Sequence, residues 1–221
     1  MNPIQEYKQL KVEYPTKKGT IEIFKNNNKA FLESLPMEEG MGGLTKYSNE
    51  SLENEKKIIL DIISDNDPRN DVVVSVYDGK IIGYITMVKS NFNERWAKLS
   101  DNSVVELGFI EVSRNWRNMG IATKMVEVTF QDGRYDDNIT YSTEYSWHWD
   151  MEYNKLNKGE YRDILLKIFK RAGFEEYDTD DPDITVDWAN MLTVRIGGDV
   201  DIERNQKFIL SLRKDSWKYG L

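Results

Sequence analysis

The sequence predicts an α/β fold in which helices pack on a mixed sheet. Two β-rich runs are joined by Asp78-Gly79, a residue pair typical of a two-residue hairpin turn. A third β-rich run ends shortly before an amphipathic helical run, and more strand and helix segments alternate after it. Hairpin strands followed by strand–helix–strand units combine antiparallel and parallel neighbours, which favours a mixed sheet covered by helices.

The first predicted elements precede the hairpin. Residues 7–26 contain two short strands around a Lys-Lys-Gly turn, and residues 51–64 have the pattern of a helix. Pro68 and its Asn and Asp neighbours then interrupt the chain. The hairpin itself occupies residues 71–88, with the sequence DVVVSVYDGKIIGYITMV.

After the hairpin, strands and helices alternate. The predicted elements are a strand at residues 102–112, a helix at 118–130, a strand at 136–145, a helix at 158–172, a strand at 191–197 and a helical end at 201–217. The helix at 158–172 has the clearest apolar face, and Gly173 is placed to end it.

Length and composition indicate one domain. The chain has 221 residues and no linker rich in Pro, Gly or Ser. We therefore expect a single domain over residues 1–221. Within it, residues 1–70 supply N-terminal strands and a helix, residues 71–198 a core region, and residues 199–221 a C-terminal helix.

Composition also narrows the function. The apolar runs are too short for a membrane span, and the first twenty residues lack a secretory signal. Cysteine is absent, which excludes thiolate catalysis and fits a cytoplasmic protein. A net charge of −8 disfavours nucleic acid as a partner and mildly favours a cationic amine substrate. With a single histidine we expect no metal site, and the acidic run at residues 178–183 is expected to be a solvated loop.

The stretch RNMGIATKM, residues 117–125, opens the helix predicted at 118–130. A helix N-terminus presents unpaired N–H groups and partial positive charge, small residues at Gly120 and Ala122 allow close approach, and Arg117 adds a cation. These features predict a phosphate-binding loop, although Gly120 could instead serve only a tight turn. The absence of Gly-Lys-Ser/Thr excludes a P-loop, and one glycine does not make a dinucleotide fingerprint.

This loop resembles the R/Q-x-x-G-x-G/A acyl-CoA loop of the GNAT superfamily of N-acetyltransferases. Four sequence segments resemble those of one branch of this superfamily, the acetoin-utilisation acetyltransferases; the segments are VVELGFIEVS, STEYSWHWD, ERW and ANMLTVRIG. Members of that branch acetylate a lysine of acetyl-CoA synthetase. The resemblance covers about residues 71–198. It implies the GNAT fold, a mixed but mostly antiparallel sheet with helices on both faces, and acetyl-CoA as co-substrate.

The resemblance also implies which residues hold acetyl-CoA. The acetyl-pantetheine arm would meet backbone groups of Ile110, Glu111 and Val112. The diphosphate would be held at Arg117, Asn118, Met119, Gly120, Ile121, Ala122 and Thr123. Ala122 stands where the family motif has its second glycine, a common variant that fits the negative φ of a helix start.

Glu106 is the candidate general base. It precedes Arg117 by eleven residues, the offset of the catalytic glutamate in histone-acetylating members of the superfamily. A partly apolar site raises the pKa of a glutamate toward neutrality, as a base for an ammonium requires. The alternative is a solvated or salt-bridged strand residue. Because the chain has no cysteine, direct attack in a ternary complex is the simpler mechanism.

Two further features concern the general acid and the acceptor. Phe169 lies four residues before Gly173, where many superfamily members have a tyrosine that acts as the general acid. Either Tyr145, Tyr161 or water takes its place, or the thiolate leaves without an acid. The stretch STEYSWHWD offers Glu144, Trp147 and His148 as contacts for a substrate lysine. The same stretch could equally be an aromatic anchor that packs the end of the sheet.

Together these features predict an acetyl-CoA-dependent protein lysine N-acetyltransferase that inactivates acetyl-CoA synthetase. Acetylation would neutralise a lysine and remove its hydrogen bonds. Two alternatives stay open at this point. One is N-acetylation of a small-molecule amine, and the other is a non-catalytic, acetyl-CoA-sensing binding partner of the synthetase.

Overall fold

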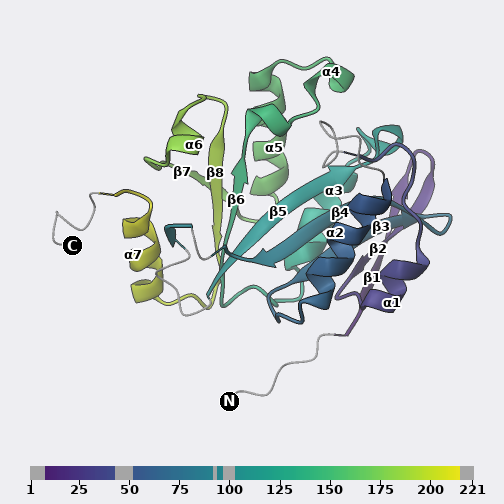
Figure 1. The fold of residues 1–221 in the computed structure, drawn as a ribbon, viewed down its shortest axis with the longest axis horizontal. Coiled ribbons are helices and arrows are strands. Elements are labelled where there is room, and N and C mark those ends of the chain that lie inside the picture. Colours follow the sequence, from purple (N-terminus) through teal and green to yellow (C-terminus); the bar gives the residue numbers. More distant parts are fainter. Residues whose placement is uncertain (1–7, 43–51, 92–93, 97–102, 215–221) are drawn as a thin grey trace. The chain divides into compact units, whose positions relative to one another are not determined.

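The computed structural model describes residues 8–42, 52–91, 94–96 and 103–214 (Figure 1). Its contacts group into two compact units. Unit 1 comprises Met1–Val88 and Gly108–Asp132, and unit 2 comprises Lys89–Leu107 and Gly133–Leu221. The single domain expected over residues 1–221 stays a prediction.

Unit 1 is built on an antiparallel meander. Its strands are β1 (Leu10–Thr16), β2 (Gly19–Lys25), β3 (Asp71–Tyr77) and β4 (Lys80–Lys89), with Lys89 itself in unit 2. Each pairs antiparallel with the next. At the predicted hairpin turn, Asp78 and Gly79 have φ values of 48° and 70°, which a type I′ turn requires. The second half of β5 (Val104–Val112) follows β4 in the strand order.

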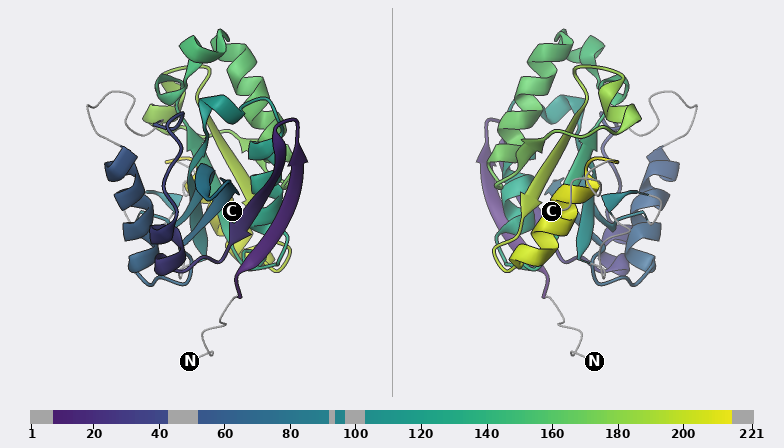
Figure 2. Two further views of the ribbon diagram at one scale, coloured as in Figure 1. Left: turned by 90° about the vertical axis from the view of Figure 1, so that its right-hand side faces the viewer. Right: turned by 90° about the vertical axis from the view of Figure 1, so that its left-hand side faces the viewer.

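Helices cover both faces of the strands in unit 1. They are α1 (Lys29–Ser34), α2 (Leu52–Ser64) and α3 (Ile121–Phe130), and Arg114–Trp116 forms a 3-10 turn before α3. Figure 2 shows α2 and α3 on opposite sides of these strands. Ile59 of α2 packs with Val72 and Val74 of β3, while α3 buries Met125 and Val126. Strand β3 is accordingly buried on both faces.

Unit 2 contains the parallel pairing of the fold. The first half of β5 runs parallel to β6 (Ile139–Glu144), with Glu106 opposite Tyr141. Strand β6 pairs antiparallel with β8 (Met191–Ile196), which pairs antiparallel with β7 (Glu175–Tyr177). Its helices are α4 (Met151–Asn154), α5 (Lys158–Lys170), α6 (Pro182–Thr185) and α7 (Ile202–Ser211). Helices α5 and α7 lie on opposite sides of the strands (Figure 2).

The predicted fold class is confirmed. The strand order β1-β2-β3-β4-β5-β6-β8-β7 is mixed and mostly antiparallel, with β5 and β6 parallel. In the part of the chain that the structure describes, no helix is long and apolar enough to cross a membrane. Helix α3 starts three residues later than predicted because Asn118 and Gly120 have positive φ values of 61° and 74°.

Several boundaries differ from the sequence pattern. Strand β6 begins at Ile139 and α5 ends at Lys170, while α1, α4, β7 and α6 were not predicted. The ends of four predicted elements, at residues 7, 51, 102 and 215–217, lie outside the described residues.

Candidate functional site

The predicted acyl-CoA loop belongs to unit 1 and forms the start of α3. Gly120 is the N-cap residue, with no side chain to cap the helix. The first helical hydrogen bond here runs from Lys124 N–H to the Gly120 carbonyl (3.0 Å). The N–H groups of Ile121, Ala122 and Thr123 therefore precede the helical ladder, which is the arrangement that binds anions at helix N-termini.

The N-terminal hairpin holds this loop in place. Tyr14 of β1 donates a hydrogen bond from Oη to the Met119 carbonyl (3.2 Å). A Cβ added at Gly120 would lie 2.6 Å from the same Oη. In the turn between β1 and β2, Lys18 Nζ donates to the Asn115 carbonyl (2.7 Å). The glycine is thus required both by its positive φ and by the close approach of Tyr14.

The end of β5 is buried, and the 3-10 turn at Arg114–Trp116 connects it to the loop. Arg117 Nε donates to the Val112 carbonyl (3.2 Å), which folds the arginine back toward the strand end. The buried Glu111 carboxylate accepts the N–H of Gly42 (2.8 Å). A Cβ at Gly83 would lie 2.8 Å from the Glu111 carbonyl oxygen, so the two backbones approach closely. Since the Glu111 side chain already has this structural contact, only its backbone suits the predicted cofactor role.

Glu106 belongs to unit 2 and is held by a phenol. Tyr141, its partner across the parallel strands, donates from Oη to Glu106 Oε2 (3.1 Å), and Ser90 Oγ lies 2.9 Å from the same Oη. The Trp96 ring packs edge-on against Tyr141 (5.4 Å). Burial raises the pKa of Glu106, the Tyr141 hydrogen bond opposes that rise, and the Glu94 carboxylate adds to it. The carboxylate is therefore oriented and has the direction of pKa shift that a general base needs.

A second carboxyl group, Glu144, lies on the other face of β6. Neighbouring strand residues alternate, so Ser142 and Glu144 face away from Tyr141. Ser142 Oγ lies 2.9 Å from the Leu107 carbonyl and 2.9 Å from Glu144 Oε1. One hydroxyl proton serves only one of these oxygens at a time, which favours a protonated Glu144. Burial raises the pKa of Glu144 to about 7, against the opposing effect of hydrogen bonds from Ser142 and Trp149.

The aromatic stretch after β6 contains both an anchor and an exposed surface. Trp149 is buried and stacks on Tyr161 (5.1 Å between ring centroids), as an anchor would. Trp147 and His148 are exposed, and Trp147 Nε1 donates to His148 Nε2 (3.1 Å). The two interpretations of this stretch therefore apply to different residues, and the predicted lysine contacts at Glu144, Trp147 and His148 stay a prediction.

Phe169 is a core residue. Its ring is fully buried and contacts Phe174 at 5.4 Å between centroids. It supplies no proton donor at the position of the usual tyrosine. Among the described residues, no group of three or more His, Asp or Glu side chains is arranged to hold a metal ion.

The sequence pattern does not indicate three residues that shape these regions, which are Tyr14, Ser142 and Tyr141. Tyr14 is 105 residues from its partner Met119, and Tyr141 is 35 residues from Glu106. Only the register of β5 and β6 could have indicated Tyr141, because parallel pairing sets which residues lie side by side.

Comparison with known proteins places the chain in a family. A model of the acetyltransferase (GNAT) family matches residues 29–157, more than half of the chain. This range includes Glu106 and the loop at 117–123, whereas the β1–β2 hairpin precedes it.

Two relatives share the name Acetoin utilization protein AcuA. The Bacillus subtilis (strain 168) protein is 34% identical over 137 residues, which cover 62% of this chain and 65% of that protein. The Bacillus licheniformis protein is 32% identical over 141 residues, which cover 64% of this chain and 67% of that protein. The matches thus span about two thirds of each relative.

Solved structures agree on the fold. The crystal structure of an acetoin utilization protein from Exiguobacterium sibiricum has a TM-score of 0.88 at 25% identity, covering 96% of this chain and 97% of that chain. Ribosomal-protein-S5-alanine acetyltransferase from Vibrio fischeri has a TM-score of 0.50 at 13% identity, covering 87% and 99%, and supports the fold alone. From the family match and these relatives, we conclude that the chain belongs to the acetyltransferase (GNAT) family.

Proposed function

We propose that this protein is an acetyl-CoA-dependent protein lysine N-acetyltransferase, that it works by direct transfer in a ternary complex, and that its substrate is acetyl-CoA synthetase. The observation that carries the proposal is on one strand. Strand β5 holds Glu106, an oriented carboxylate with a raised pKa, and leads eleven residues later to Arg117 and the uncapped start of α3.

The residues of the loop fit the anionic co-substrate. The diphosphate would be held by the N–H groups of Ile121, Ala122 and Thr123, with Arg117 beside them. The pantetheine arm would contact the backbone at Ile110, Glu111 and Val112. Gly120 supports this fit because its missing side chain leaves the helix start uncapped. Acetyl-CoA, when bound, supplies an acetyl group activated as a thioester.

The transfer requires a neutral amine. In the proposed mechanism Glu106, as a carboxylate, accepts a proton from the lysine ammonium. The amine nitrogen then attacks the thioester carbon, the C–N bond forms, the C–S bond breaks and coenzyme A leaves as a thiolate that takes up a proton. Burial of Glu106 strengthens it as a base, while Tyr141 keeps its carboxylate oriented.

The substrate assignment depends on the acetoin-utilisation resemblance. The two AcuA relatives and the Exiguobacterium sibiricum structure support that branch. Acetylation of a synthetase lysine would remove its charge and hydrogen bonds, so we propose that it lowers the activity of the synthetase. We also propose a cytoplasmic location, which the absence of cysteine supports.

The test is intact-mass spectrometry of acetyl-CoA synthetase after incubation with this protein and acetyl-CoA. We expect a mass gain of about 42 Da, one acetyl group on lysine. Glu106→Gln should reduce turnover by about 100-fold or more while acetyl-CoA binding is kept, and exposed Glu175→Gln is the matched control.

Three results would contradict the proposal in different ways. Thiol release with free amines, without any mass gain on the synthetase, indicates a small-molecule acetyltransferase. Stable co-elution with the synthetase, with no mass gain in either variant, indicates a non-catalytic partner. Full turnover by Glu106→Gln removes Glu106 from the mechanism.

A further inference from the structure

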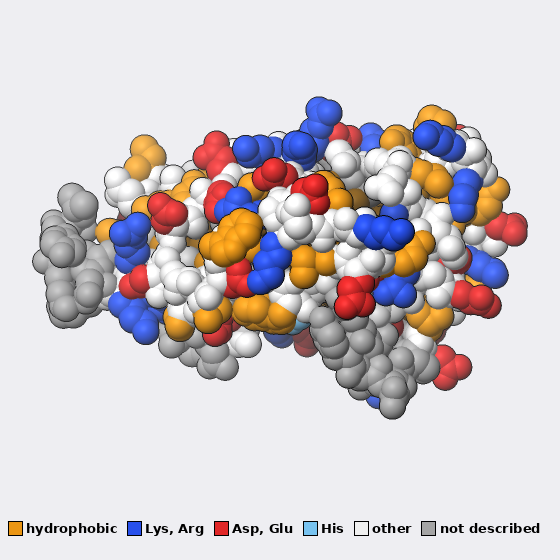
Figure 3. All heavy atoms as spheres, turned by 90° about the horizontal axis from the view of Figure 1, so that it is seen from above, with side chains coloured by type: hydrophobic (Ala, Val, Ile, Leu, Met, Phe, Trp, Pro, Cys, Tyr) orange, Lys and Arg blue, Asp and Glu red, His pale blue; other side chains and the backbone are white. Residues whose placement is uncertain are grey.

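Several large apolar residues are exposed in unit 2, and three of them, Trp147, Val186 and Trp188, define what we call the aromatic platform. Their side chains are 44%, 72% and 71% exposed. In the view onto the α4, α5 and α6 end of this unit, hydrophobic side chains lie at the surface among charged ones (Figure 3). Scattered apolar residues are normal on protein surfaces, but tryptophans grouped on one surface are typical of binding hot spots.

The Asp187 carboxylate groups these residues. Its Oδ2 accepts from Ser146 Oγ (2.9 Å) and forms an ion pair with Lys158 Nζ, and its Oδ1 accepts the Ala189 N–H (3.0 Å). The Ser146 N–H also donates to Asn190 Oδ1 (2.8 Å). Because Val186 and Trp188 flank Asp187, and Trp147 follows Ser146, all three platform residues project from backbone that these bonds tie together.

The two indoles are also supported from the side. Trp147 stacks on Tyr145 with ring centroids 4.7 Å apart and planes 13° apart. The Trp188 ring lies 3.5 Å from where a Cβ on Gly159 would stand, at the start of α5. A surface fixed in this way loses little conformational entropy when a partner binds.

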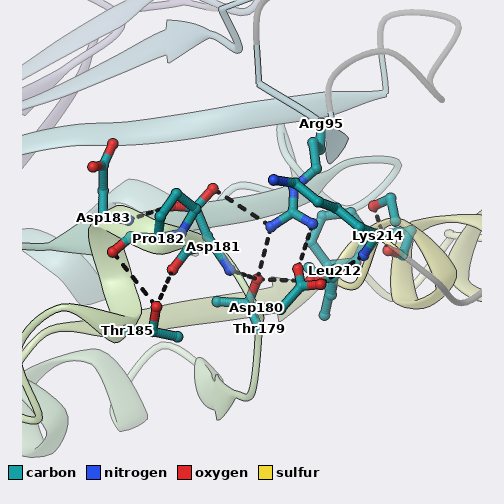
Figure 4. A network of polar contacts seen from close by, with 11 residues as sticks. Arg95, Thr179, Asp180, Asp181, Pro182, Asp183, Thr185, Leu212 and Lys214 are labelled. Atoms are coloured by element: carbon teal, nitrogen blue, oxygen red, sulfur yellow. Dashed lines mark hydrogen bonds and ion pairs between the residues drawn. The ribbon is translucent and has the colours of Figure 1, made fainter.

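The charges beside the platform select the partner. Carboxylates of Glu94, Asp181 and Asp183 all lie close enough to Tyr145 to raise its pKa, after the larger effect of burial. Arg95 pairs with Asp180 and Asp181, whereas Asp183 points away from this network (Figure 4). The run at residues 178–183 is therefore more structured than the solvated loop expected, and it still presents negative charge.

We call the carboxylates of Glu94, Asp181 and Asp183 the acidic edge, and one of them also acts on the proposed base. Glu94 is also the carboxylate that adds to the raised pKa of Glu106. Within unit 2, Glu94 thus contributes to the raised pKa of Glu106 and of Tyr145, on which Trp147 stacks. Arg95 pairs with Asp180 and Asp181, which leaves Asp183 as the carboxylate that can attract a lysine side chain beside the platform.

We propose that the aromatic platform is the docking surface for a basic, lysine-bearing segment of the protein substrate. The inference rests on the proposed function and adds to it the surface that recognises the acceptor. Anionic partners such as membranes are disfavoured by the acidic edge, and a second copy of this chain would bring the same carboxylates together.

The experiment compares a protein acceptor with a small one. For Trp188→Ala, we expect kcat/KM with acetyl-CoA synthetase to fall by about 10-fold or more, as for a hot-spot tryptophan. Turnover of a small acceptor, Nα-acetyl-lysine amide, and binding of acetyl-CoA should be unchanged. Ile202→Ala, on α7 and 77% exposed, is the matched control and should behave as wild type with both acceptors. Thermal melts establish that each variant is folded.

A second part of the experiment tests the role of negative charge. Asp183→Asn should lower the rate with the synthetase by several-fold, and added salt should weaken the wild type more than this variant, because salt screens exposed charges. Equal salt responses would contradict the electrostatic part of the proposal.

The outcomes separate the two proposals. If Trp188→Ala acetylates the synthetase with the kcat/KM of the wild type, the proposed docking surface is overturned and the proposed function stands. Acetylation of the small acceptor without any acetylation of the synthetase by wild type overturns the proposed function. Two other results would assign the platform to another occupant and overturn the inference. One is a dimer in ultracentrifugation that the Trp188→Ala substitution dissociates. The other is sedimentation of the wild type with anionic vesicles that the same substitution abolishes.

Discussion

Gly120→Ala should destabilise the proposed acyl-CoA loop for two separable reasons. The residue has a φ of 74°, and an alanine held in that left-handed region costs about 1 to 2 kcal/mol. Its Cβ would also lie 2.6 Å from Tyr14 Oη. Steric overpacking costs about 1 to 3 kcal/mol, and we expect the lower end because the phenol can tilt away at the expense of its hydrogen bond to Met119.

Gly79→Ala provides the matched control in the same unit. Its φ is 70°, and nothing lies within 4 Å of the added Cβ, so it reports the backbone cost alone. Both substitutions restrict the unfolded chain in the same way, and that contribution cancels in the comparison. Gly120→Ala should therefore lower the free energy of unfolding by about 1 kcal/mol more than Gly79→Ala.

A double-mutant cycle isolates the contact itself. In Tyr14→Phe the phenol oxygen is gone, and the nearest remaining atom, Tyr14 Cζ, lies at 3.7 Å, an ordinary contact. Gly120→Ala in that background should cost no more than Gly79→Ala, giving a coupling of about 1 kcal/mol by urea unfolding. Strictly additive effects of Tyr14→Phe and Gly120→Ala would refute the close approach. A raised KM for acetyl-CoA in Gly120→Ala, absent in Gly79→Ala, would further tie the contact to the loop.

Two predictions concern Glu106 and Glu144, two carboxyl groups of unit 2. Tyr141→Phe removes a hydrogen bond that lowers the pKa of Glu106, so the acidic limb of the kcat/KM profile should move to higher pH and kcat fall by about 10-fold, with Tyr177→Phe as the control. An unmoved limb would contradict the positioning role of Tyr141. Burial raises the pKa of Glu144 from 4.5 to about 7. Between these two pH values the folded protein keeps a proton on Glu144 that the unfolded protein has lost. The contribution of Glu144 to the free energy of unfolding therefore falls as pH rises from about 4.5 to about 7. Glu144→Gln should flatten that dependence in urea unfolding at pH 5 and pH 8, and a dependence unchanged by the substitution would contradict the assignment.

The fold was predictable where local patterns carry it. The Asp78-Gly79 turn determines the β3–β4 hairpin because both residues tolerate positive φ, and the helical period of residues 158–172 predicts α5. Helix α6 and strand β7 have four and three residues, too few to show a period. The start of α3 moved because Asn118 has a positive φ that its sequence position does not indicate.

In the candidate site, the sequence predicted only the features that depend on residues close together in the chain. The loop motif and the offset of Glu106 are local, so both could be identified from sequence. Tyr14 against Gly120, Tyr141 against Glu106 and Asp187 against Ser146 depend on which strands and loops become neighbours. The sequence separations of these pairs are large, and no pattern within a short window contains them.

The alternation of β6 makes Glu106 and Glu144 chemically distinct. Tyr141 and Ser142 are adjacent in sequence, yet one hydroxyl serves Glu106 and the other serves Glu144 on the opposite face. Burial is the largest cause of the raised pKa of both groups. The Glu94 carboxylate adds to it at Glu106, whereas no charged group is among the causes at Glu144. Neither carboxyl group is among the causes of the other's pKa shift, so we expect Glu144→Gln to leave the acidic limb of the rate profile where it is. A limb that moves in Tyr141→Phe and stays in Glu144→Gln can then be assigned to Glu106 and not to Glu144.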